Sequence, residues 1–164
     1  MITFEPLAHH PHHIDELSQW MFQMWGQFYP GSSVETTRRW LNMTMRDTGL
    51  PITQLALKGE TLVGCAMLQQ QELYKKEENL TPWLGALLVK EKYQSQGIGS
   101  QLHDWAIAHI KSLNYKKLHL LTFDANYCEW YERKGWKIIK TDDSRGYSLI
   151  VMETTIPLFA DNRG

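Results

Sequence analysis

The spacing of apolar residues divides the chain into helical and extended segments. Apolar residues at 14, 17, 20, 21, 24 and 25 recur every three to four positions, which predicts a helix over 13–25. A similar spacing returns after Ser33, a favourable helix N-cap, and after Gly97. The expected helices cover 13–25, 33–46, 97–114 and 126–134, the last closed by Gly135. The expected strands cover 2–7, 52–58, 61–70, 83–89, 117–122, 136–140 and 147–155, and 71–82 is expected to be a loop.

The order of these segments predicts the fold class. The early strands follow one another as a meander, with a hairpin turn at Gly59-Glu60, and the later strands alternate with helices. This order is typical of an α/β (mixed α+β) fold, with a twisted mixed sheet of about six or seven strands and about four helices on its two faces. Because no repeat or linker interrupts 1–164, we expect one domain.

Charge and composition exclude several classes of protein. The net charge of −1 gives no basic excess for nucleic acid, and no apolar run approaches the ~20 residues of a membrane span. Residues 1–13 lack the pattern of a secretory signal. Cys65 and Cys128 match no metal or redox spacing, and Cys65 lies in an apolar strand pattern that predicts a buried thiol. We therefore expect a cytoplasmic protein, a monomer or homodimer, with no metal.

Two segments carry candidate chemistry. Residues 94–99 read Gln-Ser-Gln-Gly-Ile-Gly, between the apolar run 84–89 and a predicted helix, where free backbone N–H groups can hold an anion. The spacing matches neither the dinucleotide fingerprint nor the phosphate loop of nucleotide hydrolases, so the residues alone leave a phosphate cradle and a steric turn both open. In the second segment, 126–136, Tyr131 lies one helical turn before Gly135. It is either a proton donor or a core tyrosine.

Taken together, the two segments resemble the GCN5-related N-acetyltransferase (GNAT) family. The resemblance covers 53–140, an acetyl-CoA-binding core; 1–50 match loosely and would form acceptor-side helices, and 141–164 would form a C-terminal strand and tail. It implies that acetyl-CoA binds in a splay between strands 84–89 and 117–122, with Lys134 a candidate for its 3′-phosphate. The implied cosubstrate-binding residues are Leu87, Leu88 and Val89 for pantetheine, Gln94, Ser95, Gln96, Gly97, Ile98, Gly99 and Ser100 for pyrophosphate, and Asn126 and Tyr131.

The resemblance also implies a reaction. A primary amine of a small molecule, protein or peptide attacks the thioester directly, a backbone N–H near Leu88 or Val89 steadies the oxyanion, and Tyr131 protonates the departing thiolate. The general base stays open because 117–122 contains no carboxylate. The candidates are His119, Asp124, Glu72, Glu78 and a chain of water molecules. The alternative is a non-catalytic acyl-CoA-binding regulatory module with the same fold.

Three further features allow two interpretations each. The run His9-His10-Pro11-His12-His13 is either a metal tract or a loop entering the first helix, and it lacks the helical spacing of a zinc site. Glu72, Glu77 and Glu78 either attract a cationic amine or form a solvated face balanced by neighbouring lysines. The seven Trp and seven Tyr residues either fill a large core or partly line a substrate groove.

Overall fold

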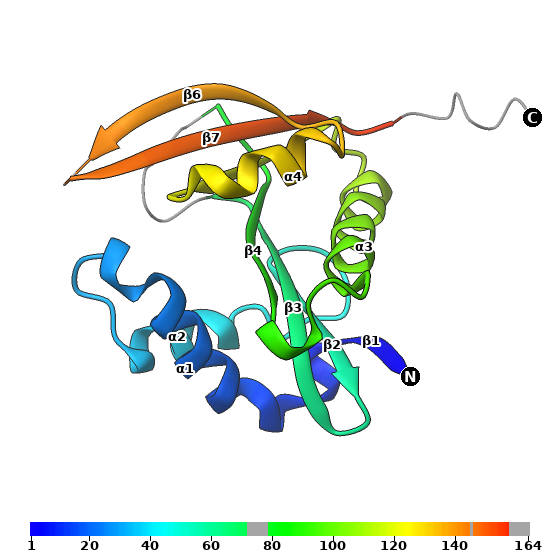
Figure 1. Cartoon of the computed structure of the whole chain (residues 1–164). Helices are drawn as coiled ribbons and strands as arrows, with labels where there is room; N and C mark the ends of the chain where they lie inside the picture. The colour runs from blue at the N-terminus through cyan, green and yellow to red at the C-terminus, as the bar shows by residue number, and fades with distance from the viewer. Residues whose placement is uncertain (72–78, 145, 158–164) are drawn as a thin grey trace, which may run out of the picture.

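A seven-stranded sheet with the strand order β1-β2-β3-β4-β5-β7-β6 forms the centre of the molecule. The computed structural model describes residues 1–71, 79–144 and 146–157 (Figure 1). Only the β4–β5 pair is parallel among the described strands, because the helix α3 crosses over between them. The strands are β1 (Ile2–Pro6), β2 (Ile52–Lys58), β3 (Thr61–Gln69), β4 (Trp83–Val89), β5 (Lys117–Thr122), β6 (Lys137–Ser144) and β7 (Tyr147–Thr155).

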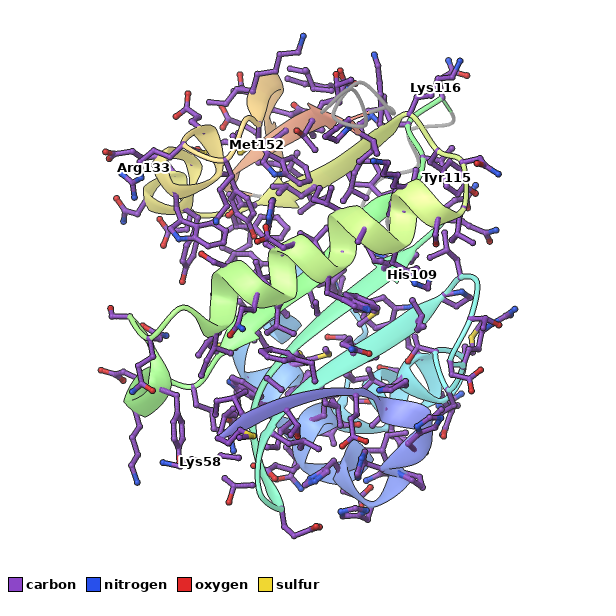
Figure 2. The ribbon with its side chains drawn as sticks, turned by 90° about the vertical axis from the view of Figure 1, so that its right-hand side faces the viewer. Lys58, His109, Tyr115, Lys116, Arg133 and Met152 are labelled. Carbon is purple, nitrogen blue, oxygen red and sulfur yellow. The ribbon has the colours of Figure 1, made fainter. Side chains whose placement is uncertain are left out.

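Helices cover both faces of this sheet, as the sequence predicts. On one face Leu17 and Met21 of α1 (Ile14–Trp25) and Leu41 of α2 (Val34–Asn42) join a buried cluster with Leu55 and Met67. On the other face α3 (Ile98–Ser112) buries Leu102, Ala106 and Ile110 in a second cluster, which also contains Tyr131 of α4 (Cys128–Glu132). Figure 2 shows α3 lying across its face of the sheet, with Arg133 at the end of α4. The predicted mixed fold is therefore confirmed.

The sheet opens between β4 and β5. The two strands pair only at Trp83 and His119 and then separate, which confirms the predicted splay. His119 holds the point where they meet: its backbone N–H and its Nδ1 both lie 3.1 Å from the carbonyl oxygen of Pro82. Its Nε2 lies 3.1 Å from Oε2 of Glu153 on β7. Beyond this point, residues 84–89 have β3 as their one described neighbouring strand, so the other edge of β4 is left open.

Several element ends differ from the prediction. The second helix ends at Asn42 rather than near 46, because Thr44 turns back to bond the carbonyl of Leu41 and accepts a hydrogen bond from Thr53 of β2. The segment expected as a helix over 126–134 begins as a 3-10 turn, Ala125–Tyr127, capped by Asp124. β6 continues past 140 to Ser144 because it forms a hairpin with β7. A contact between separate elements sets the end of α2, whereas a local cap and a hairpin pairing set the other two ends.

Two expectations about single residues, Ser33 and Cys65, are confirmed. Ser33 is the N-cap of α2 and forms a capping box with Thr36. Cys65 is fully buried, and Cys128 is a buried free thiol as well. Within the described residues no helix is long and apolar enough to cross a membrane. Glu72, Glu77 and Glu78 lie outside the described residues.

Candidate active site

A cleft of about 1120 Å³ occupies the splay between β4 and β5. The strand β4, the loop before α3, the end of β5, α4 and the first helix all contribute to its walls. Its lining includes Leu87, Leu88, Val89, Gln94, Ser95, Gly97, Gly99, Ser100, Asn126 and Tyr131, together with Trp20, Met24, Trp25, Tyr29, Lys90, Glu91, Phe123, Tyr127, Trp130 and Arg133. Most residues that the sequence singles out therefore lie around one space.

The β4 wall offers backbone hydrogen-bonding groups. Since β5 leaves β4 after Trp83, the edge of β4 along Leu87–Val89 faces the cleft rather than another strand. An open strand edge can bind an extended molecule as an added strand. At the end of this edge, Gln94 donates a hydrogen bond from Nε2 to the carbonyl of Val89 (2.9 Å), which ties the following loop to the strand.

The loop before α3 leaves backbone N–H groups free at the start of that helix. Gly97 is the N-cap of this 15-residue helix and has a φ of +85°, a left-handed conformation that glycine adopts readily. The first N–H groups of a helix have no partner within it and carry the positive end of its dipole. Two predicted residues do not line the cleft: Gln96 is exposed elsewhere, and the side chain of Ile98 is buried in the core.

Tyr131 lies on α4, opposite the β4 edge, and is 9% exposed. Its ring packs edge-on against Trp130 (centroids 5.0 Å apart) and Trp136 (5.6 Å). Burial, with a smaller contribution from Tyr127, raises the pKa of the Tyr131 phenol above its ordinary value. The hydroxyl therefore keeps its proton at neutral pH, which suits a proton donor.

A buried histidine supports this aromatic wall. The indole N–H of Trp136 donates to Nε2 of His103 (2.9 Å), so the ring hydrogen of neutral His103 lies on Nδ1, which is 3.0 Å from Oδ1 of Asp104. Burial lowers the pKa of His103, despite the opposing hydrogen bond to Asp104, and so favours this neutral form. The ring of Trp130 meets that of His103 edge-on, which connects the support to the cleft.

Charged groups at this end differ from the prediction. Lys134 is absent from the described cleft lining and places its Nζ 4.8 Å from the centroid of the Trp130 ring. Arg133 lines the cleft instead and bonds Glu129 at 2.9 Å. Arg133 adjoins Lys134 in the sequence, so the prediction identified the right region. It could not show which of the two side chains faces the cleft, because the turn of the helix decides that.

The structure does not bring the described base candidates together with Tyr131. His119 is 2% exposed, lies at the base of the splay and is absent from the described cleft lining. Asp124 is exposed and accepts a hydrogen bond from the backbone N–H of Asn126 (2.9 Å). Neither residue is among the described lining residues of the cleft.

Residues of the N-terminal third, most of them aromatic, form another wall of the cleft. The sequence alone does not predict which of these residues line it. Trp20, Met24 and Trp25 of α1 line the cleft, whereas Leu17 and Met21 of the same apolar stripe are buried in the core. The helical spacing predicts one broad apolar face for α1. Only the packing of the folded protein shows which residues of that face lie in the core and which line the cleft. Lys90 crosses this wall, with its Nζ 5.5 Å from the centroid of Trp20 and a hydrogen bond to Glu16.

The histidine tract lies outside the cleft lining and forms two 3-10 turns that lead into α1, as expected for a loop. His9, His10 and His12 approach Asp47, Glu5 and Glu60 respectively. In the parts of the chain that the structure describes, no group of potential ligands is arranged to hold a metal ion.

Comparisons with known proteins agree with this geometry. The family model described as "Acetyltransferase (GNAT) family" matches residues 14–136. An aminoglycoside 6′-N-acetyltransferase complexed with coenzyme A superposes with a TM-score of 0.72, at 20% identity over 96% of this chain and 98% of that chain. The aminoglycoside 6′-N-acetyltransferase from Enterococcus faecium gives 0.70, at 20% identity over 96% and 98%. The NatC complex bound to Gag peptide and CoA gives 0.68, at 17% identity over 95% and 99%. No curated protein matches the sequence.

Proposed function

The chain belongs to the acetyltransferase (GNAT) family, and from that premise we propose that it transfers the acetyl group of acetyl-CoA to a primary amine. One observation carries the proposal: the open edge of β4, the cradle at Gly97 and the hydroxyl-bearing ring of Tyr131 line a single cleft. A similar fold in a protein complexed with coenzyme A supports the choice of donor.

The cradle fits a pyrophosphate. A side chain added at Gly97 would meet no atom within 4 Å, so the space beside this glycine is open to a ligand. The N–H groups of residues 97–100 would bind phosphate oxygens at the helix N-terminus. Arg133, on the opposite wall, supplies a cation for a phosphate. We infer that Gln96 and Ile98 contribute through their backbone alone.

The strand edge fits the pantetheine arm. The two amides of the pantetheine arm would pair with the backbone of Leu87–Val89, as an extended chain pairs with a strand. This pairing would bring the thioester to the region of the cleft where Tyr131 and the N-terminal aromatic residues face each other. A free N–H of Leu88 or Val89 would donate to the carbonyl oxygen as negative charge develops on it.

The chemistry requires few protein groups. The lone pair of the amine nitrogen forms a C–N bond to the thioester carbon, and collapse of the adduct breaks the C–S bond. The O–H of Tyr131 gives its proton to the departing sulfur. The amine loses a proton to water in the open cleft or to Glu91, which carries the one carboxylate among the described lining residues. Positioning of the two reactants contributes most of the acceleration.

Binding and turnover must be measured separately to test this function. Acetyl-CoA should raise the melting temperature, because a ligand that binds only the folded state stabilises it. Adding a mixture of primary amines should then release free CoA thiol at a rate that depends on the amine. A melting shift without amine-dependent thiol release would instead identify a non-catalytic acyl-CoA-binding module.

A further inference from the structure

A second, smaller hollow opens from the cleft between α1 and α2. It has a volume of about 150 Å³ and shares Trp25, Tyr29 and Gly85 with the main cleft. We call it the side pocket. Because Gly85 belongs to β4, the side pocket reaches the strand that would carry the thioester. A group attached to an amine in the cleft could therefore enter it without leaving the reaction site.

The walls of the side pocket are apolar. Trp25, Trp40, Met21 and Phe22 contribute rings and a thioether. Three of the hydroxyl-bearing residues, Ser32, Thr36 and Thr37, do not offer free donors, because their hydroxyl groups bond nearby carbonyls. Ser32 donates to Gly26 (2.9 Å), and Thr36 and Thr37 both donate to Ser33 (3.0 and 2.8 Å). What Thr37 offers to a ligand is thus mainly its methyl group.

Gly85 of β4 lines the side pocket beside Gln69. It is the extra residue where the β3–β4 register shifts, and a Cβ at this position would lie 2.7 Å from Nε2 of Gln69. Gln69 alternates along β3 with Cys65 and Met67, so it lies on the α1–α2 face. Its Nε2 is buried and has no hydrogen-bond partner among the described residues, which leaves a donor unsatisfied beside Gly85.

The charges around the cleft disfavour an acceptor with several cations. Lys90, Arg133 and Glu91 are the charged side chains among the described lining residues, which gives a formal excess of one positive charge. Lys90 already bonds Glu16 and Arg133 bonds Glu129. Of the residues described around the side pocket, none is charged. Because both cations are paired with carboxylates outside the lining, Glu91 is the one carboxylate that the described lining offers to a polyamine.

From this lining we propose that the amine acceptor carries an apolar group, aromatic or branched aliphatic, that occupies the side pocket during acetyl transfer. The inference rests on the proposed acetyltransferase function and names its substrate class. The volume suits the group, since an apolar cavity of about 150 Å³ accommodates a benzene ring. The shared residues Trp25, Tyr29 and Gly85 place the side pocket directly beside the cleft.

A panel of amines tests the substrate class in the wild-type protein. With saturating acetyl-CoA, release of free CoA thiol is measured for 2-phenylethylamine, 3-methylbutylamine, ethylamine, spermidine and kanamycin. The two amines with apolar groups should show kcat/KM values at least roughly tenfold above that of ethylamine, since each methylene in a fitting pocket contributes a factor of that order. A higher kcat/KM for spermidine, kanamycin or ethylamine would overturn the inference.

A matched pair of variants locates the effect in the side pocket. Thr37→Leu places extra volume in it, whereas Arg39→Leu adds the same residue at an exposed position of the same helix. Thr37→Leu should lower kcat/KM for 2-phenylethylamine by roughly tenfold or more while sparing ethylamine, and Arg39→Leu should change neither. Equal effects of Thr37→Leu on both amines would contradict the assignment. If Thr37→Leu fails to fold, the wild-type panel still decides the substrate class.

The two proposals fail in different ways. If acetyl-CoA neither shifts the melting temperature nor releases thiol with any amine, the acetyltransferase function itself is wrong. If acetyl-CoA binds and thiol release depends on an amine, but the apolar amines are not preferred, only the inference about the side pocket is wrong. The affinity of Thr37→Leu for acetyl-CoA separates the two outcomes further. The side pocket proposal requires this affinity to equal that of the wild type.

Discussion

The ring of Phe28 stacks on the ring of Phe123, with centroids 4.1 Å apart and ring planes 3° from parallel. Tyr147 meets Phe28 edge-on at 4.6 Å. These contacts join the turn after α1 to the end of β5 and the start of β7, so they connect the N-terminal third to the opposite half of the sheet. Phe123 also lines the cleft. The stack therefore fixes the turn after α1 against a wall of the cleft, where we propose that the acceptor binds.

Replacing Phe28 by Ala should loosen this connection. We expect the free energy of unfolding to fall by about 0.5–1.5 kcal/mol beyond the loss of buried area, because an aromatic pair contributes about that much. The KM for the amine should rise while acetyl-CoA affinity stays unchanged. Phe28→Tyr, which keeps the stack, serves as the control. Steady-state kinetics and urea unfolding check both parts, and an altered affinity for acetyl-CoA alone would count against the acceptor-side role.

Tyr131→Phe should lower kcat by about 10²–10⁴-fold, which is the usual contribution of a positioned proton donor. Binding of acetyl-CoA should change little because the ring remains. Tyr127→Phe is the matched control, since Tyr127 also lines the cleft but is exposed.

Because burial raises the pKa of Tyr131, the wild type should show no loss of kcat from ionisation of Tyr131 between pH 7 and about 10. Equal kcat values for wild type and Tyr131→Phe would remove Tyr131 from the mechanism.

Gly97→Val should abolish the acetyl-CoA-dependent rise in melting temperature. Gly59→Val is the matched control, because Gly59 also has a positive φ and open space around it but lies in the β2–β3 turn. Each substitution should cost about 1–2 kcal/mol of stability from the left-handed backbone alone. Only Gly97→Val should lose the response to acetyl-CoA. A normal melting shift in that variant would mean that the loop is merely a turn.

Glu153 should make the base of the splay sensitive to acid. Burial alone would raise its pKa, but hydrogen bonds from Lys117 and His119 outweigh burial and lower it. A lowered pKa gives stability that is present above the pKa of the unfolded chain, about 4.5, and is lost as the pH falls through the folded value. At pH 7, Glu153→Gln should be roughly 1–3 kcal/mol less stable than the wild type.

Urea unfolding of both proteins across pH 3–7 would check this. The difference in unfolding free energy should narrow as the pH falls below about 4.5, because the wild type then loses the charge that the variant never had. A difference that stays constant with pH would show that Glu153 stabilises the strand pairing by packing rather than by its charge.

Sequence reasoning predicts the parts of the fold that local periodicity and end signals encode. The capping residue Ser33 and the helix that begins after Gly97 follow from spacing, whereas the splay between 84–89 and 117–122 follows from the family resemblance. The end of α2 does not, because Thr44 leaves the helix to bond Thr53, a contact across the fold. For the same reason the sequence cannot divide the α1 stripe into core and cleft residues.

The site shows the same limit. The sequence predicts Tyr131 and the β4 edge as parts of the site, because the family resemblance places both along the chain. It does not predict the side pocket, since Trp25, Trp40 and Gly85 come from three elements that meet only in the folded protein. His119 has a suitable chemistry for a base, but its hydrogen bonds to Pro82 and Glu153 are visible only once β4, β5 and β7 are assembled.

The most direct test of the central claim follows the acetyl group itself. Acetyl-CoA labelled with ¹³C in the acetyl carbonyl is incubated with the protein and 2-phenylethylamine, and the products are identified by mass spectrometry alongside a free-thiol assay. We predict one labelled N-acetyl amine for each CoA released, with transfer strongly reduced in Tyr131→Phe. Labelled acetate in place of the amide, or no label transferred despite acetyl-CoA binding, would contradict acetyl transfer to an amine.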